Sequence, residues 1–422
     1  MIERAPETIR AAGEIRFGDL LDPLSPERFF VEHWERRHLF LHRHDPSVYD
    51  GLFSFADVDR WMMASQSNPA ELLLLVPPPG SGRKSERKRL RDVTPAQLYN
   101  AFAGGNTIVL EGIQKAWPPV ARLAATLGEA LSARVRVNLY MTPAGAQGAP
   151  IHPDVQDVFV LQIEGAKDWF IYERTEELCL ESLTYLRELR GPVAGAMEEP
   201  PLVERVTLHQ GDFLYIPRGV PHRAVAPAGS PSLHLTVILE PFTWLDLIKA
   251  AAECVSVDRP ELARAVRPGF LTRPEARQGL DADFQSILRL FTESASFERT
   301  LGVVSRAWED TPWLPAGFLG DGHFEQLARL GELSPDSLVR RRAGLTCRVE
   351  PSGDGVAVVF AGNRIQMPAS AGPALEHVRD HERFRVGDLP GRLDEPSKLV
   401  LVRRLVREGL LRVDSPEAIR HE

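Results

Sequence analysis

Several features that would assign this chain to a special class of protein are missing from its 422 residues. Only three cysteines occur, Cys179, Cys254 and Cys347, and they lie too far apart to form a disulfide framework or a zinc knuckle. No run approaches the roughly 18–20 apolar residues needed to cross a bilayer. The first residues lack the charged start and continuous apolar stretch of a signal peptide. We therefore expect a reduced, cytoplasmic protein with no membrane partner.

An excess of basic charge is also missing. The chain has 50 Lys+Arg against 58 Asp+Glu, a net charge of −8, which argues against a general electrostatic attraction to nucleic acid. From residue 331 onward, 15 basic residues stand against 14 acidic ones, a net of +1, so this part also lacks the charge expected of a duplex binder. The basic stretch "GSGRKSERKRLRD" at 80–92 favours an exposed loop or solvated hairpin over a nucleic-acid contact.

Length and composition indicate a soluble protein with more than one domain. The chain is 43% hydrophobic and 26% charged, as in ordinary globular proteins, and it is too long for one ordinary core. We predict an α+β multidomain fold with boundaries near residues 240 and 330. Its parts are 1–240, in which a helical region precedes a β-rich domain, a helical region at 241–330, and a C-terminal domain at 331–422.

The pattern of residues changes along the chain in step with these boundaries. Apolar residues at helical spacing predict helices between residues 18 and 65, and again after Pro241. Between about 106 and 240, short β-rich runs are separated by Gly, Pro and Asp, which is typical of a sandwich or barrel. The last part combines a helix predicted from "SPDSLVRRR" (334–342) with short strands and two later helices, which suggests a winged-helix-like module.

Three side chains in the β-rich part form a candidate metal site. His152 and Asp154 are two residues apart, so on a strand both would point to one face. His222 follows "FLYIPRGVP" at the end of another strand. Two histidines and one carboxylate that leave coordination positions open are the facial triad of non-haem Fe(II) oxygenases. In the alternative, His152 and Asp154 are a turn pair and His222 is a loop histidine.

Lys167 is a candidate for cosubstrate binding. It lies between the apolar runs "FVLQIEG" and "WFIY", where burying a lone ammonium is costly unless an anion compensates it. 2-Oxoglutarate would supply that anion, because its keto acid chelates iron and leaves a second carboxylate for a long-armed cation. In the alternative, Lys167 lies in a hairpin turn and points to water.

These motifs resemble the JmjC-type cupin family of ribosomal oxygenases. The resemblance is strongest in "HPDVQDVFVLQIEGAKDWFIYE" (152–173), "GDFLYIPRGVPHRA" (211–224) and "SLHLTVIL" (232–239). It extends to "FFVEHWERRHLFLHR" (29–43) and "NTIVLEGIQKAWPPV" (106–120), and to the helical middle and the C-terminal part. It implies a double-stranded β-helix core, a helical dimerisation region and hence a homodimer, and a C-terminal winged-helix module.

The resemblance also implies roles for individual residues. His152, Asp154 and His222 match the iron ligands, and Lys167 matches the residue that holds the distal carboxylate of 2-oxoglutarate. The resemblance further implies a pocket lining of Asn138 and Tyr140, which point to one face of "VRVNLYMTP", with a hydroxyl contributed by Thr236. For Asn138 and Tyr140 an ordinary sheet interior stays the alternative. The family often has a serine slightly after Thr236, where this chain has Ile238.

The sequence thus predicts an Fe(II)- and 2-oxoglutarate-dependent oxygenase that uses O₂ to hydroxylate a protein side chain. The resemblance implies an arginine or histidine of a ribosomal protein as the target. The alternatives are a hydroxylase of a peptide natural product or small molecule, and a non-catalytic metal-binding cupin.

The remaining histidines are given no function. His33, His38, His42 and His44 have a spacing that fits no closed metal site, so they are interpreted as surface or packing residues. His234 either faces the pocket or fills the core.

Overall fold

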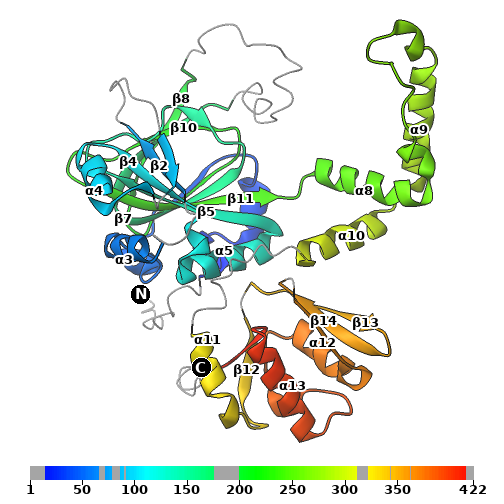
Figure 1. Cartoon of the computed structure of the whole chain (residues 1–422). Helices are drawn as coiled ribbons and strands as arrows, with labels where there is room; N and C mark the ends of the chain where they lie inside the picture. Colours follow the sequence, from blue (N-terminus) through cyan, green and yellow to red (C-terminus); the bar gives the residue numbers. More distant parts are fainter. Residues whose placement is uncertain are drawn as a thin grey trace.

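The computed structural model describes residues 15–65, 72–77, 86–89, 92–174, 199–310, 322–342, 344–361 and 363–414. A β-rich body, a projecting helical arm and a smaller C-terminal part follow one another along the chain (Figure 1). None of the helices in these ranges is both long and apolar enough to cross a membrane.

The N-terminal segment forms short helices that cover one side of the body. Ser25 caps the second of them by accepting a hydrogen bond from the Arg28 amide, and Pro26 occupies the first helical position. Phe29 on this helix is buried against Phe159 and Tyr215 of the sheet. The elements are α1 (Phe17–Leu21), α2 (Pro26–Glu32), β1 (Leu39–Leu41), η1 (Pro46–Tyr49) and α3 (Phe55–Ser65).

The body is built on an 11-stranded antiparallel sheet, which is consistent with a cupin core. The long path runs β1-β9-β7-β11-β5-β4-β2-β3, while β8 and β10 pair with β7, and β6 pairs with β10. The strands are β2 (Leu72–Val76), β3 (Glu86–Arg89), β4 (Thr107–Glu111), β5 (Ala133–Thr142), β6 (His152–Pro153), β7 (Asp157–Tyr172), β8 (Leu202–His209), β9 (Phe213–Ile216), β10 (Pro221–Val225) and β11 (Ser232–Pro241). In the 80–92 stretch, residues 86–89 form β3, which pairs antiparallel with β2.

Strand β7 connects the two halves of this sheet. Residues 157–165 pair with β11, whereas residues 166–172 pair with β8. The change of partner occurs at Gly165, where φ is +69° and a Cβ would lie 1.9 Å from the Pro231 carbonyl oxygen, so only glycine fits. The hairpin alternative for Lys167 is therefore wrong, because position 167 lies inside a continuous strand and its side chain is only 2% exposed.

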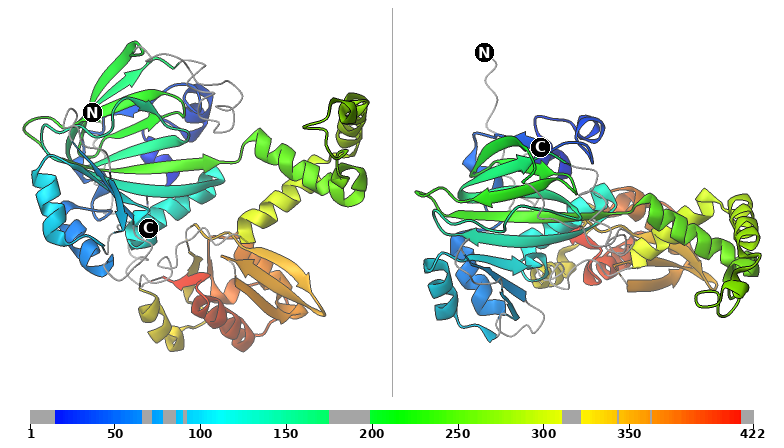
Figure 2. Two further views of the ribbon diagram at one scale, coloured as in Figure 1. Left: turned by 45° about the horizontal axis from the view of Figure 1, so that its top comes forward. Right: turned by 90° about the horizontal axis from the view of Figure 1, so that it is seen from above.

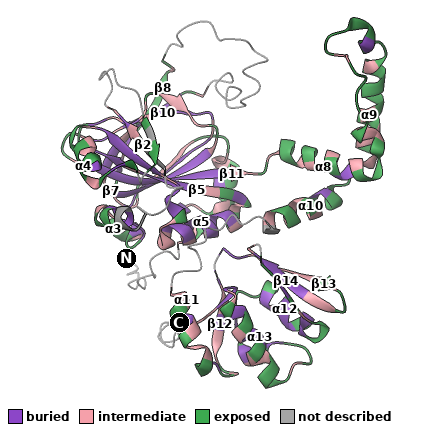
Figure 3. Ribbon diagram, viewed as in Figure 1, coloured by how far each residue is buried: buried purple, intermediate pink, exposed green. Residues whose placement is uncertain are grey.

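Helices flank the body and continue into the arm. α4 (Pro95–Ala103), η3 (Ile113–Lys115) and α5 (Pro118–Leu131) lie beside the sheet. The helical prediction after Pro241 is confirmed by α8 (Trp244–Asp258), α9 (Leu280–Ser294) and α10 (Phe297–Asp310), with η4 (Pro260–Ala263) and η5 (Pro274–Arg277) between them. The arm stands away from the body in both views of Figure 2, and Figure 3 shows that α9 is largely exposed.

The C-terminal part contains two three-stranded sheets with orders β16-β12-β17 and β13-β14-β15. The helix predicted at 334–342 is wrong, because residues 338–341 form the central strand of the first sheet and pairing on both sides outweighs local propensity. The elements are α11 (His323–Ala328), η7 (Leu330–Glu332), β12 (Leu338–Arg341), β13 (Arg348–Ser352), β14 (Gly355–Phe360), β15 (Asn363–Pro368), η8 (Ala369–Ala371), α12 (Gly372–Asp380), β16 (Arg383–Arg385), η9 (Val386–Asp388), α13 (Glu395–Arg407) and β17 (Leu411–Val413).

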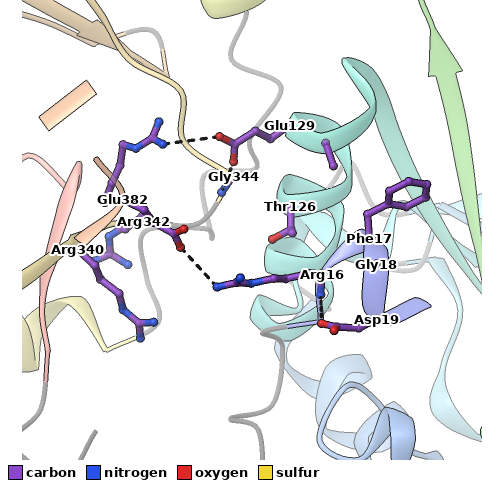
Figure 4. Close-up of a pocket in the computed structure, with 12 residues that line it drawn as sticks. Arg16, Phe17, Gly18, Asp19, Thr126, Glu129, Arg340, Arg342, Gly344 and Glu382 are labelled. Atoms are coloured by element: carbon purple, nitrogen blue, oxygen red, sulfur yellow. Dashed lines mark hydrogen bonds and ion pairs between the residues drawn. The ribbon is translucent and has the colours of Figure 1, made fainter. Parts of the chain in front are cut away.

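The C-terminal part contacts the body through α5. A Cβ on Gly344 would lie 2.4 Å from the Ala125 Cβ, so the backbone can approach this closely only at glycine. The Gly344 amide donates to Glu129 at 3.1 Å (Figure 4). Arg341 lies 3.9 Å from the same carboxylate. These contacts line a cavity of about 670 Å³ in which Arg16, Arg340 and Arg341 face carboxylates and Arg342 contacts His323, so it is an interface between the two parts and not a free anion site.

Candidate metal centre

The three predicted metal ligands lie close together. His152 and His222 are directly paired residues of β6 and β10. One ligand atom each from His152, Asp154 and His222 lies within 4.8 Å of the others, and each imidazole Nε2 is 3.7 Å from an Asp154 oxygen. β6 ends at Pro153, so the expectation that one strand carries both His152 and Asp154 is wrong, and strand pairing brings the two histidines together instead.

Backbone carbonyls orient both imidazoles. His152 Nδ1 donates to the Pro150 carbonyl at 2.8 Å, and His222 Nδ1 donates to the Val220 carbonyl at 3.0 Å. Each Nε2 is left with a lone pair that faces Asp154, as a divalent metal requires. Burial lowers the pKa of His222, which keeps this imidazole neutral and ready to bind a metal. Two imidazoles and one carboxylate on one side of a point fit a divalent metal with open positions.

Lys167 is buried with one hydrogen-bond partner among the described residues. Its Nζ donates to Thr142 Oγ1 at 2.9 Å and lies 5.9 Å from the centre of the Tyr140 ring. Burial lowers the pKa of this ammonium to about 7. In the described part of the chain no carboxylate lies within ion-pair distance of it. An anion bound beside Nζ would restore the charged form.

Two further buried polar groups lie near Lys167 and His222. His234 Nδ1 and Trp169 Nε1 are buried without a hydrogen-bond partner. The Trp169 ring lies 5.8 Å from His222 and 5.6 Å from His234, and His234 stacks on Tyr140 at 4.9 Å. Burial lowers the pKa of His234 well below its usual value, and the nearby ammonium lowers it further, so the imidazole is neutral. Unpaired polar atoms beside a buried cation fit a ligand with an anionic, hydrogen-bonding end.

The other predicted pocket residues occupy neighbouring positions on paired strands. Asn138 and Thr236 face each other across β5 and β11, and both are buried. Asn138 Oδ1 accepts a hydrogen bond from the Gly112 backbone amide at 3.0 Å, so the oxygen of the Asn138 side chain stabilises the turn before η3. Burial raises the pKa of the Tyr140 phenol to about 12, with a smaller contribution from the Asp154 carboxylate. These groups are therefore neutral donors and acceptors near neutral pH.

The sequence interpretation missed Thr142 and Trp169. Thr142 lies two residues after Tyr140 on β5, and Trp169 lies two residues after Lys167 on β7. Side chains two residues apart on a strand point to the same face. The sequence could therefore have predicted that Thr142 lies beside Tyr140 and that Trp169 lies beside Lys167.

Comparison with known proteins gives consistent matches. Residues 113–247 match the family described as the JmjC domain. Ribosomal oxygenase 1 of Rattus norvegicus is 32% identical over 289 residues, 67% of this chain and 45% of that protein. The bifunctional lysine-specific demethylase and histidyl-hydroxylase NO66 of Branchiostoma floridae is 31% identical over 278 residues, 66% of this chain and 40% of that protein. The chain thus spans less than half the length of these two relatives.

A solved structure supports the overall architecture. The ribosomal oxygenase YcfD from Escherichia coli, in complex with cobalt and 2-oxoglutarate, matches with a TM-score of 0.51 and 18% identity. The match covers 93% of this chain and 99% of that one. At this level of identity the likeness concerns the fold.

Proposed function

We propose, on the premise that this chain is a JmjC-domain protein related to the ribosomal oxygenases, that it is an Fe(II)- and 2-oxoglutarate-dependent oxygenase. Its proposed substrate is an arginine or histidine side chain of a ribosomal protein. The observation that carries the proposal is the position of a buried, uncompensated ammonium, Lys167, close to the metal centre. It lies two residues before Trp169 on β7, and the Trp169 ring is 5.8 Å from that of His222.

The residues present fit both absent groups. His152, Asp154 and His222 would hold Fe(II), because they provide two imidazoles and one carboxylate. Lys167, aided by the Thr142 hydroxyl, would hold the distal carboxylate of 2-oxoglutarate. Bound together with O₂, these groups would supply oxidative chemistry that yields succinate and CO₂ and places one oxygen atom on the substrate. The protein contributes orientation and a site shielded from water.

A cavity beside the metal centre offers room for a polypeptide substrate. Its volume is about 700 Å³, and one of its residues, Val155, directly follows the metal ligand Asp154. Trp244 at its rim is 77% exposed. Exposed aromatic side chains commonly anchor protein partners. The other lining residues are Trp34, Glu35, Arg174, Arg218, Pro241, Phe242, Thr243, Leu245 and Leu247.

Incubation of the chain with ribosomal proteins, Fe(II), 2-oxoglutarate and O₂ tests the proposed function. We expect one ribosomal protein to gain the mass of one oxygen atom on an arginine or histidine, located by tandem mass spectrometry, with matching succinate release. Succinate release that responds only to small molecules, or oxygen found on no ribosomal protein, would reject the protein substrate.

Two alanine variants, one at a tryptophan of the cavity and one at a phenylalanine elsewhere, test whether the cavity binds the protein substrate. Trp244→Ala should lower kcat/KM for the protein substrate by roughly 10-fold, the size expected for an exposed aromatic anchor. Phe324→Ala removes a similarly exposed ring on α11 and should leave kcat/KM unchanged. Equal values of kcat/KM for the two variants would show that the cavity does not bind the protein substrate.

We infer that the helical arm makes a homodimer. None of the side chains of α9 is buried within the chain, although Phe284 and Leu288 lie one turn apart on it. An apolar helical stripe that its own chain leaves open favours a two-fold interface.

Light scattering tests the dimer. We expect a mass of twice 47.0 kDa for the wild-type chain and a shift toward 47.0 kDa for Phe284→Asp. Gln285→Asp places the same charge on the neighbouring residue, off the apolar stripe, and should stay dimeric. A wild-type mass of 47.0 kDa would contradict the inference.

A further inference from the structure

A second group of metal-binding side chains lies outside the proposed active site. One ligand atom each from His42, His209 and Asp212 lies within 4.8 Å of the other two. His42 follows β1, His209 ends β8, and Asp212 lies in the turn before β9. The three residues therefore join chain segments that are far apart in sequence but adjacent in the sheet, since β1 pairs with β9. The interpretation of His42 as a surface or packing residue did not include these partners.

Asp212 is fixed in place by its surroundings. Its side chain is 1% exposed, its Oδ1 accepts the Arg43 amide at 3.0 Å, and its Oδ2 accepts the His209 amide at 2.8 Å. His42 Nδ1 lies 2.8 Å from Oδ1. A carboxylate offers about four acceptor positions, so these partners leave capacity for one more bond. A buried carboxylate held by backbone amides is a preorganised ligand rather than an ordinary surface acid.

The distances are close to those of a metal site. Ligand atoms about 2.0–2.2 Å from a tetrahedral Zn²⁺ lie roughly 3.3 Å from one another. The His42 Nδ1 to Asp212 Oδ2 distance is 2.9 Å, and the His209 Nδ1 distance to the same oxygen is 3.8 Å. Binding of a metal would displace the proton between His42 and Asp212. The contact of Asp212 with His42 would then lengthen, and its contact with His209 would shorten, each by about half an ångström.

We propose that His42, His209 and Asp212 form a second divalent-metal site of the Zn²⁺ class. Imidazole and carboxylate ligands suit Zn²⁺ and its neighbours in the transition series. The site opens into a hollow of about 670 Å³ that shares no lining residue with the His152, Asp154 and His222 centre. The His44 ring, with its centre 3.8 Å from that of His42, lies at the edge of the same hollow.

The proposed role is structural. The metal would tie the segment after β1 to the turn between β8 and β9, and His209 is directly paired with Ala166, the residue before Lys167. No lysine is among the described residues that line this hollow, so they lack the feature that fits 2-oxoglutarate at the first site. Open coordination positions would face water, because the side chains of His42 and His209 are 38% and 60% exposed.

Zinc titration of the untagged full chain against a chromophoric chelator tests the proposal. We expect two zinc ions per chain for wild type, and one for the double variant His152→Ala/His222→Ala, which retains only the second site. Adding His209→Ala to that double variant should weaken the remaining zinc affinity by at least ~10-fold, because one ligand is lost. His209 is exposed, so its removal leaves the fold and the His42–Asp212 contact in place.

A matched control removes another pair of histidines. His377 and His381 stack at 3.9 Å at the end of α12. Replacing both with alanine in the His152→Ala/His222→Ala background should leave one tight zinc ion and the same zinc-induced rise in melting temperature. The proposal is overturned if zinc neither binds nor raises the melting temperature in that background, or if His209→Ala changes neither quantity. Neither outcome touches the proposed oxygenase, whose ligands are already absent from these variants.

Discussion

Replacement of His222 by alanine is expected to reduce 2-oxoglutarate turnover by more than ~100-fold, since changes to groups that merely support metal ligands already cost 10–100-fold. His222 is the buried member of the metal centre, and its Nε2 faces the Asp154 carboxylate at 3.7 Å. Removal leaves one imidazole and one carboxylate, too few ligands for tight Fe(II) binding. Succinate release and anaerobic Fe(II) titration should therefore fail together.

The control for this variant is an exposed histidine elsewhere. His381→Ala should retain turnover, because His381 lies in the C-terminal part of the chain. His222 is buried, so a second variant guards against misfolding: His152→Ala removes a 40% exposed ligand and should give the same loss with an unchanged melting profile. Turnover that survives in both ligand variants would show that the metal centre lies elsewhere.

The metal centre could be anticipated from sequence because its residues lie in short local patterns. His152 and Asp154 are two residues apart, and His222 ends a strand-and-turn pattern of glycines and prolines. What the sequence could not provide was the register. His152 lies opposite His222 only because the two-residue strand β6 pairs with β10, and no local propensity predicts so short a strand.

Side chains whose partners are remote in sequence were harder to interpret. His42 and Asp212 are separated by 170 positions, and only the pairing of β1 with β9 brings them together. The strand at 338–341 was mistaken for a helix for a similar reason, since neighbouring strands on both sides determine its conformation.

Lys167→Met is expected to act in opposite directions on cosubstrate affinity and on stability. The ammonium is 2% exposed, and breaking a buried ion pair by removing one partner costs about 3–5 kcal/mol. The KM for 2-oxoglutarate should therefore rise by roughly 100-fold or more. Without cosubstrate the variant should instead melt at a higher temperature than wild type, because methionine fills a similar volume without burying a charge.

The stability difference should depend on pH with a defined sign. The pKa of Lys167 falls from 10.5 in the unfolded chain to about 7 in the folded chain because the ammonium is buried. Between these values the unfolded chain binds more protons at this group, so its contribution to the free energy of unfolding rises with pH. The full penalty, about 5 kcal/mol, applies below pH 7 and disappears toward pH 10.5.

Melting curves at pH 7, 8 and 9 for wild type, Lys167→Met and the exposed control Lys115→Met test this sign. The advantage of Lys167→Met should be largest at pH 7 and shrink at pH 9, and saturating 2-oxoglutarate with Mn²⁺ should stabilise wild type far more than the variant. Lys115→Met should follow wild type throughout. A Lys167→Met variant that binds 2-oxoglutarate normally and melts below wild type at every pH would mean that the ammonium has a structural partner and no anionic ligand. In that case burial of Lys167 would no longer support cosubstrate binding, and the metal centre alone would have to carry the proposed function.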